Sequence, residues 1–217
     1  MRASAEPLWF GPQERPLAGW LHLPVGGLAR GGVVVCPSIA GEHVNAQRTL
    51  RSLAEQLAHD GLAVLRLDYD GTGDSAGEWE DPDRLAAWTA SITTAVQELR
   101  SAGLREVALI GMRVGALLAA RAASVEPVEA LVLWDPVVRG RAFLREQRAL
   151  SALAGLAQPE VGAGVETPGF VFPPALVAEL ETADLASVPR PLASHVLVLT
   201  RDDRPAPPRA PTALCGA

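Results

Sequence analysis

An arginine stands at the tip of a glycine turn, between a predicted strand and a predicted helix. The segment covers residues 109–121 and reads LIGMRVGALLAAR. Gly111 and Gly115 permit a sharp strand-to-helix bend and a close approach of a neighbouring chain. Arg113 at the tip brings five hydrogen-bond donors and a permanent positive charge, but no nucleophile. Its expected chemistry is therefore binding of a carboxylate, a phosphate or another anion, supported by the free N–H groups that begin the helix.

Polar residues that could pair with Arg113 follow other predicted strands. Ser38, Glu42 and His43 come after the first buried strand, and Asp135 comes at the end of a later one. In open α/β sheets, ligands bind beyond the carboxyl ends of the strands, so we expect these side chains near one another. Two interpretations stay open. Arg113 forms a structural ion pair with Asp135 or Glu42, which we favour, or Ser38, Glu42, Arg113 and Asp135 bind an external anion.

A nucleophile elsewhere in the same loop is a further interpretation, which we do not favour. A Cys36–His43 or Ser38–His43 pair is geometrically conceivable. A cysteine that ends a buried run, however, usually packs as an inert residue. Serine in a loop commonly bonds to the local backbone. For His43 itself we favour a surface or capping role over catalysis.

The elements that must position these residues alternate between strand and helix. Such alternation predicts an α/β fold with a mostly parallel sheet and helices on both faces. Apolar–polar alternation around Gly11-Pro12 predicts an antiparallel hairpin over 8–23 at one sheet edge. The expected strands are 31–37, 63–75 with its glycine turn, 106–111, 129–138 and 195–203; the expected helices are 46–60, 81–103, 115–123, 139–157 and 173–186; residues 158–174 form a Gly- and Pro-rich excursion.

Length and composition indicate one domain with an aliphatic core. The 217 residues fit a single unit, which we assign to residues 1–203, followed by a Pro-rich, disordered tail at 204–217. A net charge of −6 argues against a nucleic-acid surface, which needs a concentrated basic patch.

Cys36 and Cys215 lack metal-site spacing, and no nucleotide-binding glycine motif is present, so we expect no metal and no cofactor. The sequence has no apolar run long enough to span a bilayer and no signal-peptide pattern, and we expect a cytoplasmic protein.

Several segments together are similar to a known family. LDYDGTGDSAGE (67–78) and LIGMRVGALLA (109–119) resemble the α/β-hydrolase superfamily, in which the turn reads G-x-S-x-G. Segments 37–75, 111–119, 131–150 and 168–185 more narrowly resemble bacterial hydrolase-like proteins associated with exosortase systems. The resemblance covers nearly the whole chain and implies a doubly wound, mostly parallel hydrolase fold, of which we expect this sequence to lack the last strand. It also implies that G-x-R-x-G occurs among members of the narrower group.

The resemblance implies a catalytic triad that this sequence does not complete. Arg113 stands at the nucleophile position, Asp202 or Asp203 matches the acid, and none of the four histidines follows them. Three hypotheses follow: a hydrolase of esters, thioesters or amides; a non-catalytic relative that binds a small anionic or acyl ligand or a partner protein; and a non-hydrolytic enzyme that uses Arg113, His43 and acids. The residues favour a pseudoenzyme without Ser-dependent hydrolysis. The strand at 195–203 is a potential free edge, from which we expect a homodimer.

Overall fold

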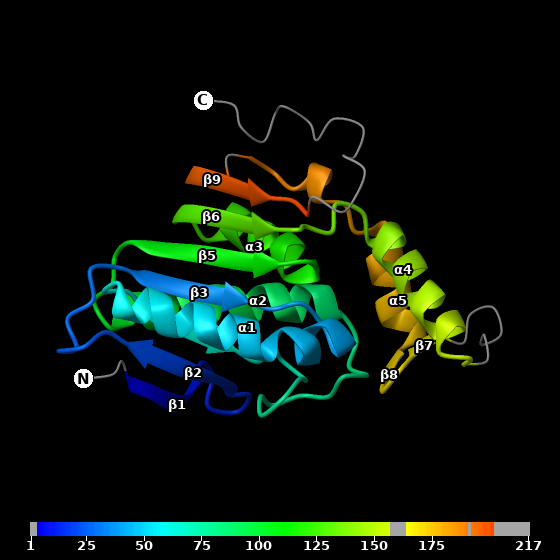
Figure 1. Cartoon of the computed structure of the whole chain (residues 1–217), viewed down its shortest axis with the longest axis horizontal. Helices are drawn as coiled ribbons and strands as arrows, with labels where there is room; N and C mark the ends of the chain where they lie inside the picture. Colours follow the sequence, from blue (N-terminus) through cyan, green and yellow to red (C-terminus); the bar gives the residue numbers. More distant parts are fainter. Residues whose placement is uncertain (1–3, 157–163, 191, 202–217) are drawn as a thin grey trace.

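The computed structural model describes residues 4–156, 164–190 and 192–201. Within them, seven strands form one sheet in the order β1-β2-β4-β3-β5-β6-β9 (Figure 1). Strands β4, β3, β5, β6 and β9 run parallel to one another. Strand β2 pairs antiparallel with both β1 and β4. The strands of this sheet are β1 Ser4–Phe10, β2 Leu17–Leu23, β3 Gly32–Cys36, β4 Ala63–Leu67, β5 Val107–Met112, β6 Val128–Trp134 and β9 Ala193–Leu199.

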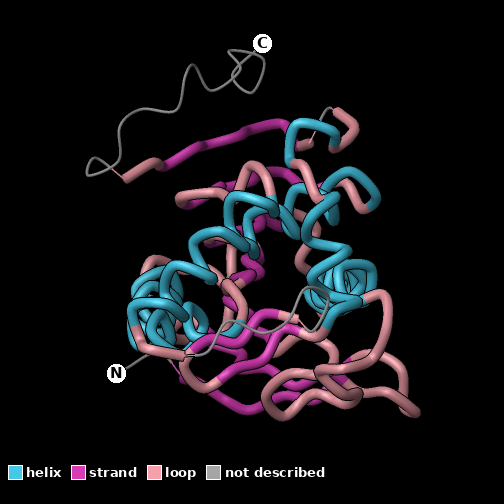
Figure 2. Tube along the Cα trace, turned by 90° about the vertical axis from the view of Figure 1, so that its right-hand side faces the viewer, coloured by secondary structure: helices cyan, strands magenta, loops and turns pink. Residues whose placement is uncertain are grey.

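Helices lie on both faces of the sheet. Helix α1 packs over β4 on one face, and α2 and α3 pack together on the other (Figures 1 and 2). Between β6 and β9, the chain leaves the sheet and forms α4, a short hairpin and α5 beside the carboxyl ends of the strands (Figure 1). The bounds of these elements are α1 Ala40–His59, α2 Arg84–Ser101, α3 Val114–Val125, α4 Gly140–Leu153, β7 Val165–Thr167, β8 Phe170–Phe172, α5 Pro174–Thr182 and the 3₁₀ turn η1 Leu185–Ser187.

The predicted fold class is confirmed, and the burial pattern explains it. The run Val33–Cys36 of β3 is buried on both faces, as a central parallel strand must be. Helix α3 is apolar almost all round and is buried along most of its length against β5 and β6. The apolar faces of a parallel sheet are buried by helices, so the helices that alternate with the strands in the sequence pack against the two faces of the sheet.

Several boundaries differ from the sequence predictions. Helix α1 begins at Ala40 rather than 46, because its first turn carries small and polar residues that show no apolar periodicity. The excursion at 158–174 contains the hairpin β7–β8, whose strands are too short for an alternation signal. Helix α2 begins later than the predicted residue 81. The helix begins at Arg84, and the Glu179 carboxylate accepts hydrogen bonds from its first two backbone N–H groups, at 3.0 and 2.8 Å.

Candidate functional site

The turn after β5 has the strained backbone of a strand-to-helix elbow. Arg113 has φ 55° and ψ −116°, a conformation that costs a non-glycine residue of order 1–3 kcal/mol. A Cβ on Gly115 would lie 2.2 Å from the carbonyl oxygens of Cys36 and Pro37, and one on Gly111 would lie 2.5 Å from the Ala116 Cα. Both glycines are therefore required by close backbone approach, which confirms the reason given for them from sequence.

The Arg113 guanidinium lies among three carboxylates from three separate elements. Its Nε and Nη2 donate to Glu42 of α1 at 3.1 and 3.0 Å, and its Nη1 donates to Asp135 at 3.3 Å. Its Nη2 also donates to Glu146 of α4. The side chain is only 10% exposed. We call Arg113, Glu42, Asp135, Glu146 and the nearby Arg201 the elbow cluster; Arg201 Nε lies 3.3 Å from the Asp135 carboxylate.

The elbow cluster holds more negative than positive charge. Three carboxylates face two guanidinium groups, so the formal balance is −1 (2 − 3). Burial by itself lowers the pKa of Arg113, but the hydrogen bonds and charges of Glu42 and Glu146 outweigh it and hold that pKa above its ordinary value. Arg113 therefore stays protonated, and carboxylates of the chain itself already occupy its donors.

Residues of the loop after β3 take roles that leave no free nucleophile beside the elbow. Ser38 Oγ donates to Glu42 Oε2 at 2.6 Å, which orients the carboxylate that binds Arg113. The Cys36 thiol is fully buried, its pKa is raised by burial, and its Sγ donates a weak hydrogen bond to the Val34 carbonyl oxygen at 3.9 Å. A buried thiol of raised pKa is not a thiolate at neutral pH.

His43 lies on the same helix as Glu42 but has different partners. Its Nε2 contacts the Gln47 side chain at 2.5 Å and lies 4.0 Å from Asp68 Oδ1, while its Nδ1 is buried without a partner. Burial lowers the pKa of His43, against the opposing charge of Asp68. None of the chain's four histidines, all of them described, hydrogen-bonds to the elbow cluster. The imidazole is thus neutral at pH 7 and separate from Arg113.

The sequence-based site is only partly brought together. The structure joins Ser38, Glu42, Arg113 and Asp135, whereas Asp202 lies outside the described residues. Glu146 was not anticipated, although it is the only acidic residue of the otherwise basic helix α4, which is a detectable signal. In the described part of the chain, no group of His, Cys, Asp and Glu has an arrangement that could hold a metal ion.

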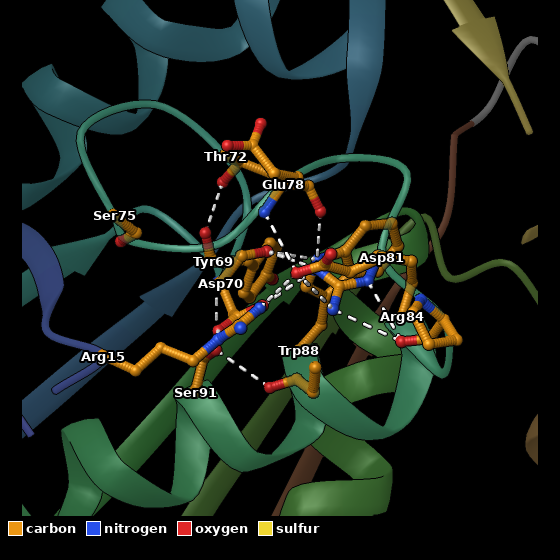
Figure 3. A network of polar contacts seen from close by, with 12 residues as sticks. Arg15, Tyr69, Asp70, Thr72, Ser75, Glu78, Asp81, Arg84, Trp88 and Ser91 are labelled. Carbon is orange, nitrogen blue, oxygen red and sulfur yellow. Dashed lines mark hydrogen bonds and ion pairs between the residues drawn. The ribbon is translucent and has the colours of Figure 1, made fainter. Parts of the chain in front are cut away.

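The glycine turn after β4 forms a second polar network with a structural role (Figure 3). The Arg84 side chain donates to the Asp70 carboxylate at 2.8 Å and to the carbonyl oxygens of Glu78 and Asp70, at 3.0 and 3.3 Å. Arg15 also binds Asp70, and Trp88 Nε1 donates to the Asp70 carbonyl oxygen at 2.9 Å. We call these residues the Arg84 network; it fixes the glycine turn that was predicted within 63–75.

Comparison with solved structures identifies similar folds. The structure of Est1E from Butyrivibrio proteoclasticus with bound ferulic acid superimposes with a TM-score of 0.69 at 20% identity, covering 88% of this chain and 77% of that one. The structure of GrgF, an α/β hydrolase of Penicillium sp. sh18, superimposes with a TM-score of 0.65 at 16% identity, covering 92% of this chain and 81% of that one. The structure of a Xanthomonas campestris serine hydrolase without a lid superimposes with a TM-score of 0.53 at 21% identity, covering 62% of each chain. At these identities the likeness concerns the fold.

Sequence comparison points to the same group. A search of the curated proteins finds no match. The pattern of the family described as serine aminopeptidase, S33, a hydrolase family, matches residues 29–191, which is most of the chain and includes the elbow. The chain therefore belongs to the serine aminopeptidase S33 family of α/β hydrolases.

Proposed function

We propose that this chain is a member of the hydrolase family without Ser-dependent hydrolysis, in which the elbow holds an ion-pair cluster in place of a nucleophile. The observation that carries the proposal is the tip of the elbow. Arg113 stands there, and each of its side-chain partners is a carboxylate. A guanidinium offers hydrogen bonds only, so acyl transfer to this residue has no chemical route.

The remaining candidate nucleophiles support the same proposal. Ser38 is bonded to a carboxylate rather than to an imidazole, and Cys36 is buried with a raised pKa. A serine or cysteine nucleophile needs a base within hydrogen-bond reach. His43, the histidine nearest in sequence, contacts Gln47 and Asp68 instead. The non-hydrolytic enzyme hypothesis needs Arg113 and His43 to act together, and their separate partners do not favour it.

A reactivity probe tests the loss of hydrolysis. We expect no covalent labelling of the protein by a fluorophosphonate and no turnover of p-nitrophenyl acetate above the level of Arg113→Ala. The matched variant Arg113→Ser restores a hydroxyl at the tip, and we expect it to stay unlabelled as well, since no described histidine contacts this position. Labelling of the native protein would contradict the proposal. Labelling of Arg113→Ser alone would show that a general base is present after all.

One observation favours a second function, binding of a small anionic or acyl ligand at the elbow. The side chain of Glu146 is 38% exposed, against 22% for Glu42 and 11% for Asp135. Glu146 also belongs to the excursion beside the sheet rather than to the sheet itself. A carboxylate ligand could therefore take the place of Glu146 on Arg113 Nη2 while the two more buried pairs persist.

Ligand-induced thermal stabilisation tests this second function. With straight-chain carboxylates such as acetate and hexanoate as probes, Glu146→Gln should bind more tightly than the native protein, because its neutral side chain competes less for Arg113. Arg113→Ala should lose the response. Arg148→Ala, on the same helix but paired with Glu181, is the matched control and should respond as the native protein does. An equal response of Arg113→Ala and the native protein would show that the elbow is not the anion site.

Other expectations stay predictions. The cytoplasmic location and the single domain over residues 1–203 rest on the sequence alone. Of the helices that the structure describes, none is both long and apolar enough to cross a membrane. The homodimer concerns the sheet beside β9 rather than the elbow cluster, and it too is a proposal.

A further inference from the structure

A pocket lies between α2, α3 and the segment around η1, on the face of the sheet opposite α1 (Figures 1 and 2). Its volume is about 580 Å³, within the range of about 300–1,000 Å³ in which clefts hold small organic ligands. Its lining comes from positions 86, 89, 90 and 93 of α2, positions 117, 121, 124 and 125 of α3, and residues between 182 and 189. Each of the two helices therefore presents one face to the pocket. None of the described lining residues belongs to the elbow cluster.

Arg121 brings to this pocket a positive charge that no described acid neutralises. Within the described ranges, no carboxylate lies within 4.0 Å of its guanidinium, and the side chain is partly buried. Asp184 is the single acid among the described lining residues, and both of its oxygens are engaged. Its Oδ1 accepts from the Ala186 backbone N–H at 2.8 Å, and its Oδ2 lies 3.9 Å from Arg139 Nε. The guanidinium donors of Arg121 are therefore available to an anion.

The hydroxyl groups of the lining are acceptors toward a ligand. Five hydroxyl side chains belong to the described lining, and each donates its own proton to a backbone carbonyl oxygen of its own segment, at 2.6–2.9 Å. They are Thr89, Thr93, Ser124, Thr182 and Ser187. A hydroxyl whose proton is already donated keeps lone pairs that accept hydrogen bonds. The pocket therefore suits a ligand that carries an O–H donor in addition to its anionic group.

The apolar part of the lining is aliphatic. Leu117 and Val188 are 1% and 7% exposed and belong to the hydrophobic core, so they form the base of the pocket. Val125 is 74% exposed and lies at its mouth. None of the described lining residues is aromatic. Such a surface favours burial of a saturated hydrocarbon, because it offers no ring for aromatic stacking.

We propose that this pocket binds a small aliphatic hydroxy acid. The ligand carboxylate accepts hydrogen bonds from the Arg121 guanidinium, its hydrocarbon body packs on Leu117 and Val188, and its hydroxyl donates to one of the lining hydroxyl oxygens. Arg113 and Arg121 are eight residues apart at the start and along the length of α3, which is about 12 Å along the helix axis. Binding at Arg121 does not rest on the proposed function of the elbow.

Titration calorimetry of the full chain with trans-4-hydroxycyclohexanecarboxylate tests this assignment. We expect one equivalent to bind with a dissociation constant below about 1 mM. The corresponding carboxamide lacks the charge and should bind at least about tenfold more weakly. Cyclohexanecarboxylate lacks the hydroxyl and should bind about threefold to tenfold more weakly. No binding below about 1 mM, or equal binding of either analogue, overturns the proposal.

Three variants locate the bound carboxylate. Arg121→Gln removes the charge and should weaken binding of the hydroxy acid at least about tenfold. The matched control is Arg51→Gln, the same change at an exposed arginine of α1 on the opposite face of the sheet, and it should bind as the native protein does. Arg113→Ala should also bind normally. Circular dichroism checks that each variant is folded, and the comparison of analogues needs no variant.

The pattern across these variants decides between the pocket and the elbow. Equal affinity of Arg121→Gln and the native protein overturns the proposal. A loss in Arg113→Ala with none in Arg121→Gln would place the carboxylate at the elbow, and it overturns the proposal as well. An equal loss in Arg121→Gln and Arg51→Gln would show attraction by overall charge rather than a site, with the same consequence.

Discussion

Arg84 and Arg113 are two buried arginines in contrasting environments. The Arg84 guanidinium is hydrogen-bonded to one carboxylate and to backbone carbonyl oxygens, and the ion pairs around it balance two arginines against two acids (Figure 3). The Arg113 guanidinium is hydrogen-bonded only to side-chain carboxylates, and the five residues of its cluster are three acids and two arginines. The first arrangement holds a turn in place. In the second, one partner, Glu146, is 38% exposed and comes from a helix outside the sheet.

The difference shows which buried charge is available for binding. Backbone carbonyl oxygens cannot leave a guanidinium without unfolding the turn, whereas a side-chain carboxylate on a separate helix can rotate away. An arginine fixed by its own loop is therefore a structural residue, and one held by carboxylates from three elements is a candidate for ligand exchange. Substitutions of Arg84 and Arg113 should therefore differ in their effect on the free energy of unfolding.

The largest loss of stability is expected for Arg84→Ala. Removing this side chain takes one of its two arginines from Asp70 and takes a buried donor from the Glu78 and Asp70 carbonyl oxygens, and breaking a buried pair in this way costs about 3–5 kcal/mol of the free energy of unfolding. Urea denaturation measures the loss. Arg51→Ala removes an exposed arginine paired with Glu55 and should cost less than about 0.5 kcal/mol. A cost below about 1 kcal/mol for Arg84→Ala would remove the contrast between the two sites.

Arg113→Ala should lower the free energy of unfolding by less, about 2–3 kcal/mol, since Glu42 and Glu146, at 22% and 38% exposed, can rehydrate. Arg113→Gly removes the same guanidinium but also relieves the strained backbone at φ 55°. It should therefore be about 1 kcal/mol more stable than Arg113→Ala. Denaturation of the two variants side by side measures the strain. Equal stability of the two would show that the elbow stores none.

Acid should weaken the Arg84 network through Asp70. The hydrogen bond from Arg15 lowers the pKa of Asp70 below its ordinary value of 3.8; burial opposes this effect, and Arg84 adds to it. A carboxyl with a lowered folded-state pKa stabilises the native state above pH 3.8, and this contribution disappears as the pH falls through the folded-state value. The stability difference between native protein and Asp70→Asn should therefore be constant above about pH 5 and shrink below pH 3.8. Asp74→Asn, an exposed change in the same turn, should show no such trend.

The smallest effect is expected for Glu146→Gln. Because Glu146 is the most exposed of the three carboxylates on Arg113, neutralising it should change the free energy of unfolding by less than about 0.5 kcal/mol. Glu42→Gln is the matched comparison, and it should cost about 1–2 kcal/mol, because Glu42 also holds Ser38. Equal costs for the two variants, measured by urea denaturation, would show that Glu146 is as firmly bound as Glu42.

Much of the fold could be predicted from local patterns in the sequence. Continuous β-branched runs such as that of β3 indicated buried strands, and helical patterns that end at Gly61 and Gly103 indicated α1 and α2. The hairpin β7–β8 and the first turn of α1 escaped prediction, because three-residue strands and polar helical turns have no periodic signal. The cap of α2 escaped because Glu179 is more than ninety residues away in sequence.

For the site, the elbow and the residue at its tip could be read from local sequence alone. Gly111 and Gly115 dictate a close turn, and Arg113 excludes a hydroxyl nucleophile there, whatever surrounds it. Only the tertiary structure decided which acids meet the guanidinium. Glu42 and Asp135 were both candidates from their positions after strands, and both bind, while Glu146 comes from a helix that leaves the sheet. Side-chain partnerships across elements depend on packing direction, which spacing along the chain does not encode.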